Sequence, residues 1–278
     1  RMELAREQGI APEKISGRQV LESYLEDIGP GGDLRKYLQQ SQIAYRSGNT
    51  LYVHRAVTNE NLGNIPGQET KANGVDGWVS GLNDWYRSEV GAWESGKSQG
   101  RDLIRYQEPV PGTRANLGSV VYSRFSDATG NPQLPGDELI EELKRSGIDR
   151  VVVGHTPNGD SPTILRKQGF EVIIADNTES PHGNILEIRD DRVRVRAKTR
   201  LGGADWHDID MAWRIDSESD LGTRAPGSNT LVKGVTTDGQ AIGYKVGPGF
   251  KAEQFSLPAG ASSGCQSLFA TKLKALLP

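Results

Sequence analysis

Residues 148–157 have the sequence IDRVVVGHTP, and this stretch decides how the rest of the chain is interpreted. Three consecutive valines are typical of a strand buried on both faces, because β-branched side chains favour extended backbone. Gly154, His155, Thr156 and Pro157 follow at once. The pattern predicts a buried strand that ends at a histidine, with Gly154 allowing the backbone to turn sharply.

A second apolar run ends in the same way, since residues 51–53 precede His54. In open α/β sheets, ligands gather beyond the carboxyl ends of the strands. A histidine at such an end can offer a ring nitrogen to a metal while a partner on its other nitrogen fixes the tautomer. Either histidine alone could be structural, but the pair in like contexts predicts a shared metal. Their ligating nitrogens should lie within about 4 Å of each other when a metal is bound, and up to several ångströms farther apart without it.

The residues around these two strands alternate between helical and extended patterns, which is typical of α/β proteins. Beyond about residue 191 the pattern becomes alternating and rich in glycine, and predicts a β-rich C-terminal extension. Gly48 and Asn49 form a turn pair of the hairpin type. Helices are expected over residues 20–28, 33–48, 78–93, 134–148 and 267–277. Strands are expected over residues 117–125 and 170–178, and on both sides of Asp190 and Asp191. A polar linker is expected over residues 218–229.

Trp78, Leu82, Trp85 and Trp93 recur at spacings that suit one face of a helix. Aromatic side chains at helical spacing more often pack on a core than bind a ligand. We therefore expect this row to be a core face.

The composition limits the classes of partner. A formal net charge of -3 gives no general attraction to a nucleic-acid backbone or an anionic membrane, so we expect neither partner. No apolar run approaches the roughly 18 residues that a membrane span needs. The single cysteine, Cys265, cannot form an internal disulfide, which favours a reducing compartment such as the cytoplasm. The oligomeric state is left open.

Together these motifs resemble the last two metal-ligand motifs of the calcineurin-like metallophosphoesterases, in particular the serine/threonine phosphoprotein phosphatase branch. LYVHRAV around His54 and VVVGHTP around His155 carry the resemblance, supported by the 134–148 helix and by VIIADN around Asp176. Pro157 stands where many relatives outside that branch have a second histidine. The resemblance covers residues 1–190, which we expect to be the C-terminal part of such a domain, with residues 191–278 as the β-rich extension.

The resemblance implies a two-sheet α/β sandwich with helices outside, and a phosphoesterase that acts on a phosphorylated protein or small phosphoester. It implies two divalent metal ions, with His54 and His155 as ligands. The ligand types suit Mn, Fe or Zn, and the sequence does not choose among them. Arg55 and Arg124 are candidate phosphate-binding residues, although Arg55 in a surface salt bridge is an equal alternative. Thr156 and Asp176 are expected to support the ligand histidines.

The family's other metal ligands come from motifs that precede these histidines, and none of those motifs stands before His54. Asp205-Trp206-His207 matches one of them literally but follows His155, and we interpret it as a chance match on a surface turn. We likewise expect His182 to be a loop residue. RMELAREQG already resembles the middle of a helix, so we expect preceding polypeptide to supply the missing motifs, and the chain alone to be inactive. The alternative is a non-catalytic binding module derived from a degenerate phosphatase.

Overall fold

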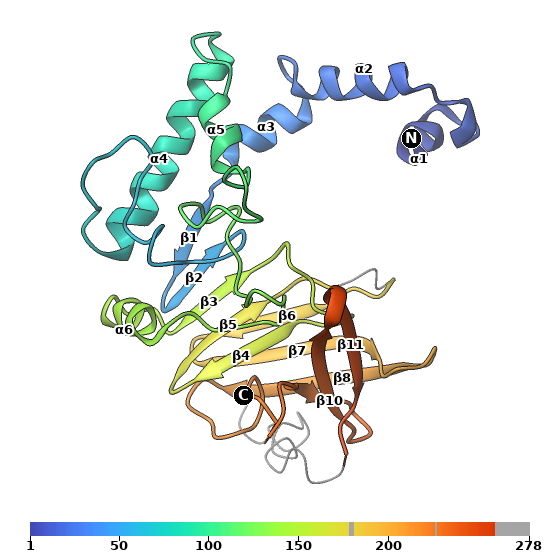
Figure 1. Ribbon diagram of the computed structural model, residues 1–278. Helices are drawn as coiled ribbons and strands as arrows, with labels where there is room; N and C mark the ends of the chain where they lie inside the picture. The colour runs from blue at the N-terminus through green and yellow to red at the C-terminus, as the bar shows by residue number, and fades with distance from the viewer. Residues whose placement is uncertain (178–180, 226, 259–278) are drawn as a thin grey trace.

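A five-stranded mixed sheet, in the order β1-β2-β3-β5-β4, lies at the centre of the protein (Figure 1). The computed structural model describes residues 1–177, 181–225 and 227–258. Two antiparallel three-stranded sheets, β6-β7-β8 and β11-β10-β9, complete the β structure of these residues, so the expected α/β class is confirmed. The strands are β1 (Ala44–Ser47), β2 (Thr50–Val53), β3 (Arg150–Val153), β4 (Thr163–Lys167), β5 (Phe170–Ile174), β6 (Ile185–Arg189), β7 (Arg192–Arg200), β8 (Trp206–Arg214), β9 (Leu231–Val235), β10 (Ala241–Gly247) and β11 (Lys251–Ser256).

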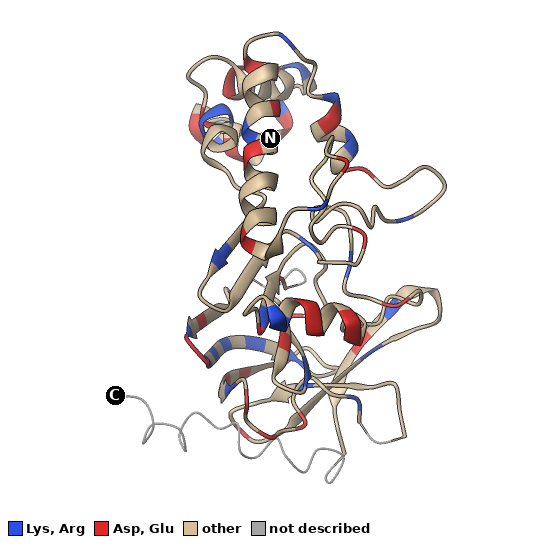
Figure 2. Cartoon of the chain, turned by 90° about the vertical axis from the view of Figure 1, so that its left-hand side faces the viewer, with Lys and Arg blue, Asp and Glu red and all other residues tan. Residues whose placement is uncertain are grey.

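Helices gather at the N-terminal side of the fold (Figure 1). They are α1 (Met2–Gln8), η1 (Pro12–Lys14), α2 (Gly17–Ile28), α3 (Asp33–Gln40), α4 (Gly74–Glu94), α5 (Arg101–Tyr106) and α6 (Asp137–Arg145), with the short η2 (Pro248–Phe250) near the other end. Acidic residues lie in the first turn of α6 and basic residues in its last turn, as Figure 2 shows. Among the described residues, no helix has both the length and the apolar character needed to cross a membrane.

Successive residues of the central strands point to opposite faces of the sheet, because the side-chain period of a strand is two residues. Val151 and Val153 of β3 pack in one core cluster, whereas Val152 packs in another. The continuous apolar run is therefore explained by burial on both sides, as the sequence predicted.

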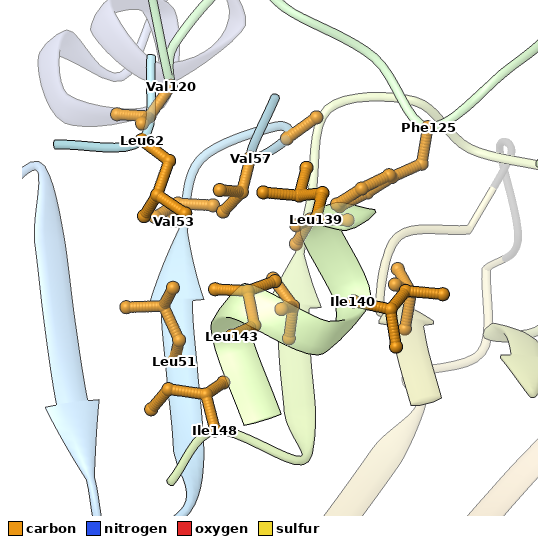
Figure 3. Packing of buried hydrophobic residues seen from close by; sticks show 14 of the residues in the cluster. Leu51, Val53, Val57, Leu62, Val120, Phe125, Leu139, Ile140, Leu143 and Ile148 are labelled. Carbon is orange, nitrogen blue, oxygen red and sulfur yellow. The ribbon is translucent and has the colours of Figure 1, made fainter. Parts of the chain in front are cut away.

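Helices cover the first face of the sheet. Leu139 and Leu143 of α6 pack over Leu51 and Val53 of β2 (Figure 3). Trp78 of α4 belongs to the same cluster. The expected core row is confirmed for Trp78 and Leu82, which are fully buried, while Trp85 is partly buried against the same cluster and Trp93 is half-buried at the end of α4.

The two small sheets cover the second face. The cluster on that side joins Ile173 of β5 to Val195 of β7, Trp213 of β8 and Ile242 of β10. Asp190 and Asp191 form the turn between β6 and β7, as the sequence predicted. The second face is thus built from residues on both sides of the expected division at residue 190, and that division stays a prediction.

A buried ion pair joins the central sheet to β8. Glu171 and Arg150 have fully buried side chains, and Arg150 Nε donates to Glu171 Oε1. Trp213 Nε1 donates to Glu171 Oε2 over 2.9 Å, and Arg150 donates to Thr50 Oγ1 over 3.0 Å. One carboxylate therefore links residues of four strands, β2, β3, β5 and β8, and its charge is compensated in place.

Four elements differ from the sequence predictions. The helix expected over 33–48 ends at Gln40, because residues 44–47 pair with β2 through the Gly48-Asn49 hairpin and tertiary pairing overrides the helical pattern. Residues 117–125 are not a strand, because their backbone groups bond to loops, for example Val120 O accepting from Arg55 N. Strand β4 was not predicted. The expected linker 218–229 is packed rather than free, since Leu221 is fully buried.

The N-terminal helices form as expected, but they bury little. The apolar stripe of α2 is exposed at Leu21, Tyr24 and Leu25. The helix expected over 267–277 lies outside the described residues.

Replacing Glu171 with glutamine should lower the free energy of unfolding by about 3–5 kcal/mol, because it leaves the buried guanidinium of Arg150 without a compensating charge. Denaturant unfolding measures the change. Glu187→Gln is the matched control, since Glu187 lies 3.6 Å from Arg196 in a largely solvent-exposed pair and should change stability by less than about 1 kcal/mol. Equal effects of the two substitutions would contradict the role given to Glu171.

Candidate functional site

His54 and His155 meet at the carboxyl ends of two adjacent parallel strands. Strand β2 pairs with β3 so that Tyr52 lies opposite Val152. Beyond the strands the pairing continues, with Gly154 N donating to His54 O over 2.9 Å. The two imidazole ring centroids lie 4.8 Å apart, with the rings inclined by 55°. The expected meeting of these two distant residues is confirmed.

Gly154 has a different role from the one expected. Its φ is not positive, and the sharp bend is made by His155, whose φ is 61°. A non-glycine residue in this region is uncommon and marks local strain of the kind found at functional sites. A Cβ atom on Gly154 would lie 3.1 Å from Asp176 Oδ1. Glycine at this position leaves room for the Asp176 carboxylate beside the histidine pair.

The surroundings keep both imidazoles neutral. Burial, the neighbouring His155 and the charge of Arg55 lower the pKa of His54, while Asp176 opposes the shift. Burial and the charges of Arg55 and Arg124 lower the pKa of His155, and Asp176 again opposes them. At pH 7 each ring is therefore in the deprotonated form that binds a metal ion.

Arg55 follows His54 and is buried, with 5% of its surface exposed. Its guanidinium lies 4.3 Å over the Tyr122 ring. Two of its nitrogens, Nε and Nη1, are buried and have no hydrogen-bond partner among the described residues. Burial and the charge of Arg124 lower its pKa. The alternative of a surface salt bridge is wrong, and the position is one where an anion would compensate a buried charge.

Arg124 and Thr156 lie on the side of the pair that faces the C-terminal sheet. Arg124 is exposed, and Thr156 is half-buried directly after His155. Both residues line a cavity together with Tyr244 of β10. The loop after His155 is fixed by that sheet, because the buried Lys233 Nζ donates to Asn158 O and Tyr244 donates to Asn158 Oδ1 over 3.3 Å.

A separate apolar cavity of about 610 Å³ opens beside His54. Its walls include Trp85 of α4, Tyr106 of α5, Tyr45 of β1 and Val153 of β3. The site is therefore open to solvent on this side as well.

The other two histidines have partners elsewhere. His182 packs edge-on against Trp206, with ring centroids 4.8 Å apart. His207 Nδ1 lies 3.8 Å from Asp238 Oδ2. The expectation that His207 lies in a loop or surface turn is wrong, because Trp206 and His207 begin strand β8 and pair with β7.

Among residues 1–177, 181–225 and 227–258, no group of three or more His, Cys, Asp or Glu side chains is arranged to hold a metal ion. The structure thus brings together two imidazoles, two arginines and one nearby carboxylate, Asp176. Sequence reasoning missed Tyr122, the ring under Arg55. No local pattern marked it, since it lies in a segment expected to be a strand.

Compared with protein-family models, with curated proteins and with solved structures, the chain matches none of them.

Replacing Arg55 with methionine should raise the free energy of unfolding in anion-free buffer by about 1–4 kcal/mol, because an apolar side chain of similar length removes a buried, uncompensated charge. Excess inorganic phosphate should raise the melting temperature of the unmodified protein but not that of Arg55→Met, since a ligand stabilises the state that binds it. Arg101→Met, at an exposed position of α5, is the control and should leave both quantities unchanged. Phosphate stabilisation that survives Arg55→Met would contradict this assignment.

Proposed function

We propose that residues 1–278 carry part of the active site of a metal-dependent phosphoesterase that resembles the phosphoprotein phosphatase branch of the calcineurin-like metallophosphoesterases. The observation that supports it most is the histidine pair, with ring centroids 4.8 Å apart beside the buried and uncompensated guanidinium of Arg55. Such a cluster is suited to a metal ion and a phosphate together, because the metal would take the imidazoles and the phosphate the guanidinium.

The donor set fits the proposed metal in part. His54 and His155 are neutral imidazoles that would hold one ion, and Mn, Fe or Zn would suit them. Two divalent ions, when bound, supply an activated water and stabilise the charge on the phosphate oxygens. A dinuclear site also needs carboxylate ligands beyond those in the described residues. We propose that polypeptide outside residues 1–278 supplies these ligands, so that the chain alone holds half of the site.

The remaining residues have roles that follow from their positions. Arg55 would bind the phosphate oxygens, and Arg124 would add a second, exposed guanidinium near His155. Asp176 would support the ligand histidines, since its carboxylate is close enough to both rings to influence their pKa values. Thr156 offers a hydroxyl next to His155. The reaction joins the oxygen of water to phosphorus, breaks the ester P–O bond and returns a proton to the leaving alcohol.

A non-catalytic binding module is the second candidate. It is favoured by the absence of a three-residue ligand group within the described parts of the chain. The same arginines could bind a phosphorylated partner without hydrolysing it. The two functions differ in metal dependence, because a purely anion-binding site does not require the histidines to hold an ion.

Zinc binding tests the metal site directly. We expect the chain to bind Zn²⁺ and the substitution His155→Asn to weaken binding by about tenfold or more, because it removes one of two imidazole ligands. Isothermal titration calorimetry measures the affinity. The control is His207→Asn, at a histidine with a partner elsewhere, which should bind zinc like the unmodified chain. Unchanged affinity in His155→Asn would favour the binding module.

A phosphatase assay tests the proposal that the chain alone holds half of the active site. With added Mn²⁺, the chain alone should hydrolyse p-nitrophenyl phosphate little or not at all, because the described residues do not supply the carboxylate ligands of a dinuclear site. A longer polypeptide that includes the preceding residues of its own coding sequence should be active, and His155→Asn should remove most of that activity while leaving the fold intact. Robust metal-dependent turnover by residues 1–278 alone would contradict the half-site.

A further inference from the structure

A second cavity lies on the other side of the histidine pair, between the loops of residues 110–130 and the C-terminal sheet. Its volume is about 880 Å³, within the range of roughly 300–1,000 Å³ that is usual for small-molecule sites. Arg124 and Thr156 line it, and Thr156 directly follows His155. The cavity therefore adjoins the candidate site at Arg124 and Thr156, and a group bonded to a phosphate held at that site could extend into it.

An aromatic ring is fixed at the edge of this cavity. Phe250, the last residue of η2, lines the cavity and is 55% exposed. Its φ is 60°, which is a strained conformation for a bulky residue. A Cβ atom on Gly130 would lie 3.0 Å from Cδ1 of this ring. Gly130 therefore leaves room for the ring, and the backbone of Phe250 holds an apolar surface open to solvent instead of burying it.

Guanidinium groups accompany the ring. Arg114 Cζ lies 5.0 Å from the centroid of Phe250, and Arg114 and Arg124 both line the cavity. In the part of the chain that the structure describes, neither arginine forms an ion pair with a carboxylate. Asp127 also lines the cavity, but its Oδ1 accepts hydrogen bonds from Thr129 and Asn131 in its own turn. The cavity thus combines an aromatic face with two cations that are available to a ligand.

We propose that this cavity binds the leaving group of the phosphoester and selects an aromatic leaving group over an aliphatic one. The proposal rests on the proposed function, because the phosphate would be held by Arg55 and the histidine pair. A flat ring would pack against Phe250 and beneath the guanidinium of Arg114, where offset stacking and cation–π attraction both act. Arg124 would lie near the ester oxygen, between the two parts of the ligand. The substrate class is thus an aryl phosphate, which includes phosphotyrosine.

Three small probes test this assignment on the chain with saturating Zn²⁺, by ligand-observed NMR. Phenylphosphonate should bind roughly tenfold more tightly than methylphosphonate, because only the former has a ring to place on Phe250. Phe250→Ala should remove this difference and leave methylphosphonate binding unchanged. Arg114→Ala should reduce the difference, as an independent variant at an exposed loop position. Phe255→Ala is the matched control, since Phe255 lies on strand β11, which directly follows Phe250, but does not line the cavity.

The third probe, phenol, separates the two proposals. Equal affinity for the two phosphonates would overturn the leaving-group assignment and leave the phosphate site standing. If phenol binds as tightly as phenylphosphonate, and Phe250→Ala abolishes phenol binding, the cavity binds a ring without a phosphate site. That result would overturn the proposed function. Failure of both phosphonates to bind would overturn both proposals. Circular dichroism confirms that each variant is folded.

Discussion

The buried carboxylate of Glu171 is the constraint on which the rest of the structure depends. It compensates Arg150, accepts from Trp213 and, through Arg150, reaches Thr50. A one-residue slip of β3 or β5 would separate these groups and would also move every apolar side chain to the opposite face of the sheet. The ion pair lies at the amino ends of β3 and β5 and fixes the register of these strands there. The same register determines which residues lie side by side at the carboxyl ends of the strands, where His54 and His155 meet.

The surroundings of the histidine cluster, unlike those of Glu171, leave a buried charge without full compensation. Around Glu171 every charge is compensated, whereas Arg55 is buried with two nitrogens that have no hydrogen-bond partner among the described residues. His155 has a positive φ, and a Cβ atom on Gly154 would lie tightly against the carboxylate of Asp176. One end of the sheet therefore has a buried ion pair, whereas the other end has backbone strain and a buried guanidinium without an ion-pair partner among the described residues. This combination is typical of a binding site, because a ligand supplies what the protein alone lacks.

The C-terminal β structure contributes to this end of the sheet in two ways. It holds the loop after His155 through Lys233 and Tyr244, and it forms a wall of the second cavity. Burial lowers the pKa of Lys233 to about 7. The β-rich segment was expected as an extension beyond the catalytic part, yet Ile242 packs in the same cluster as Val152 of β3. Its contacts therefore place it against the central sheet and beside the candidate site.

The sequence by itself determined the buried strands, the 134–148 helix, the Gly48-Asn49 hairpin and the two histidines, because each has a local signal: an apolar run, a periodic face, a turn pair or a rare residue after a strand. Only the tertiary structure decided that residues 44–47 form an edge strand, that Arg55 is buried over Tyr122, and that Phe250 and Arg114 lie beside Thr156. These features depend on contacts between residues distant in the sequence. A propensity or spacing rule evaluates neighbours along the chain, and it has no information about which loop or strand supplies the other half of a contact.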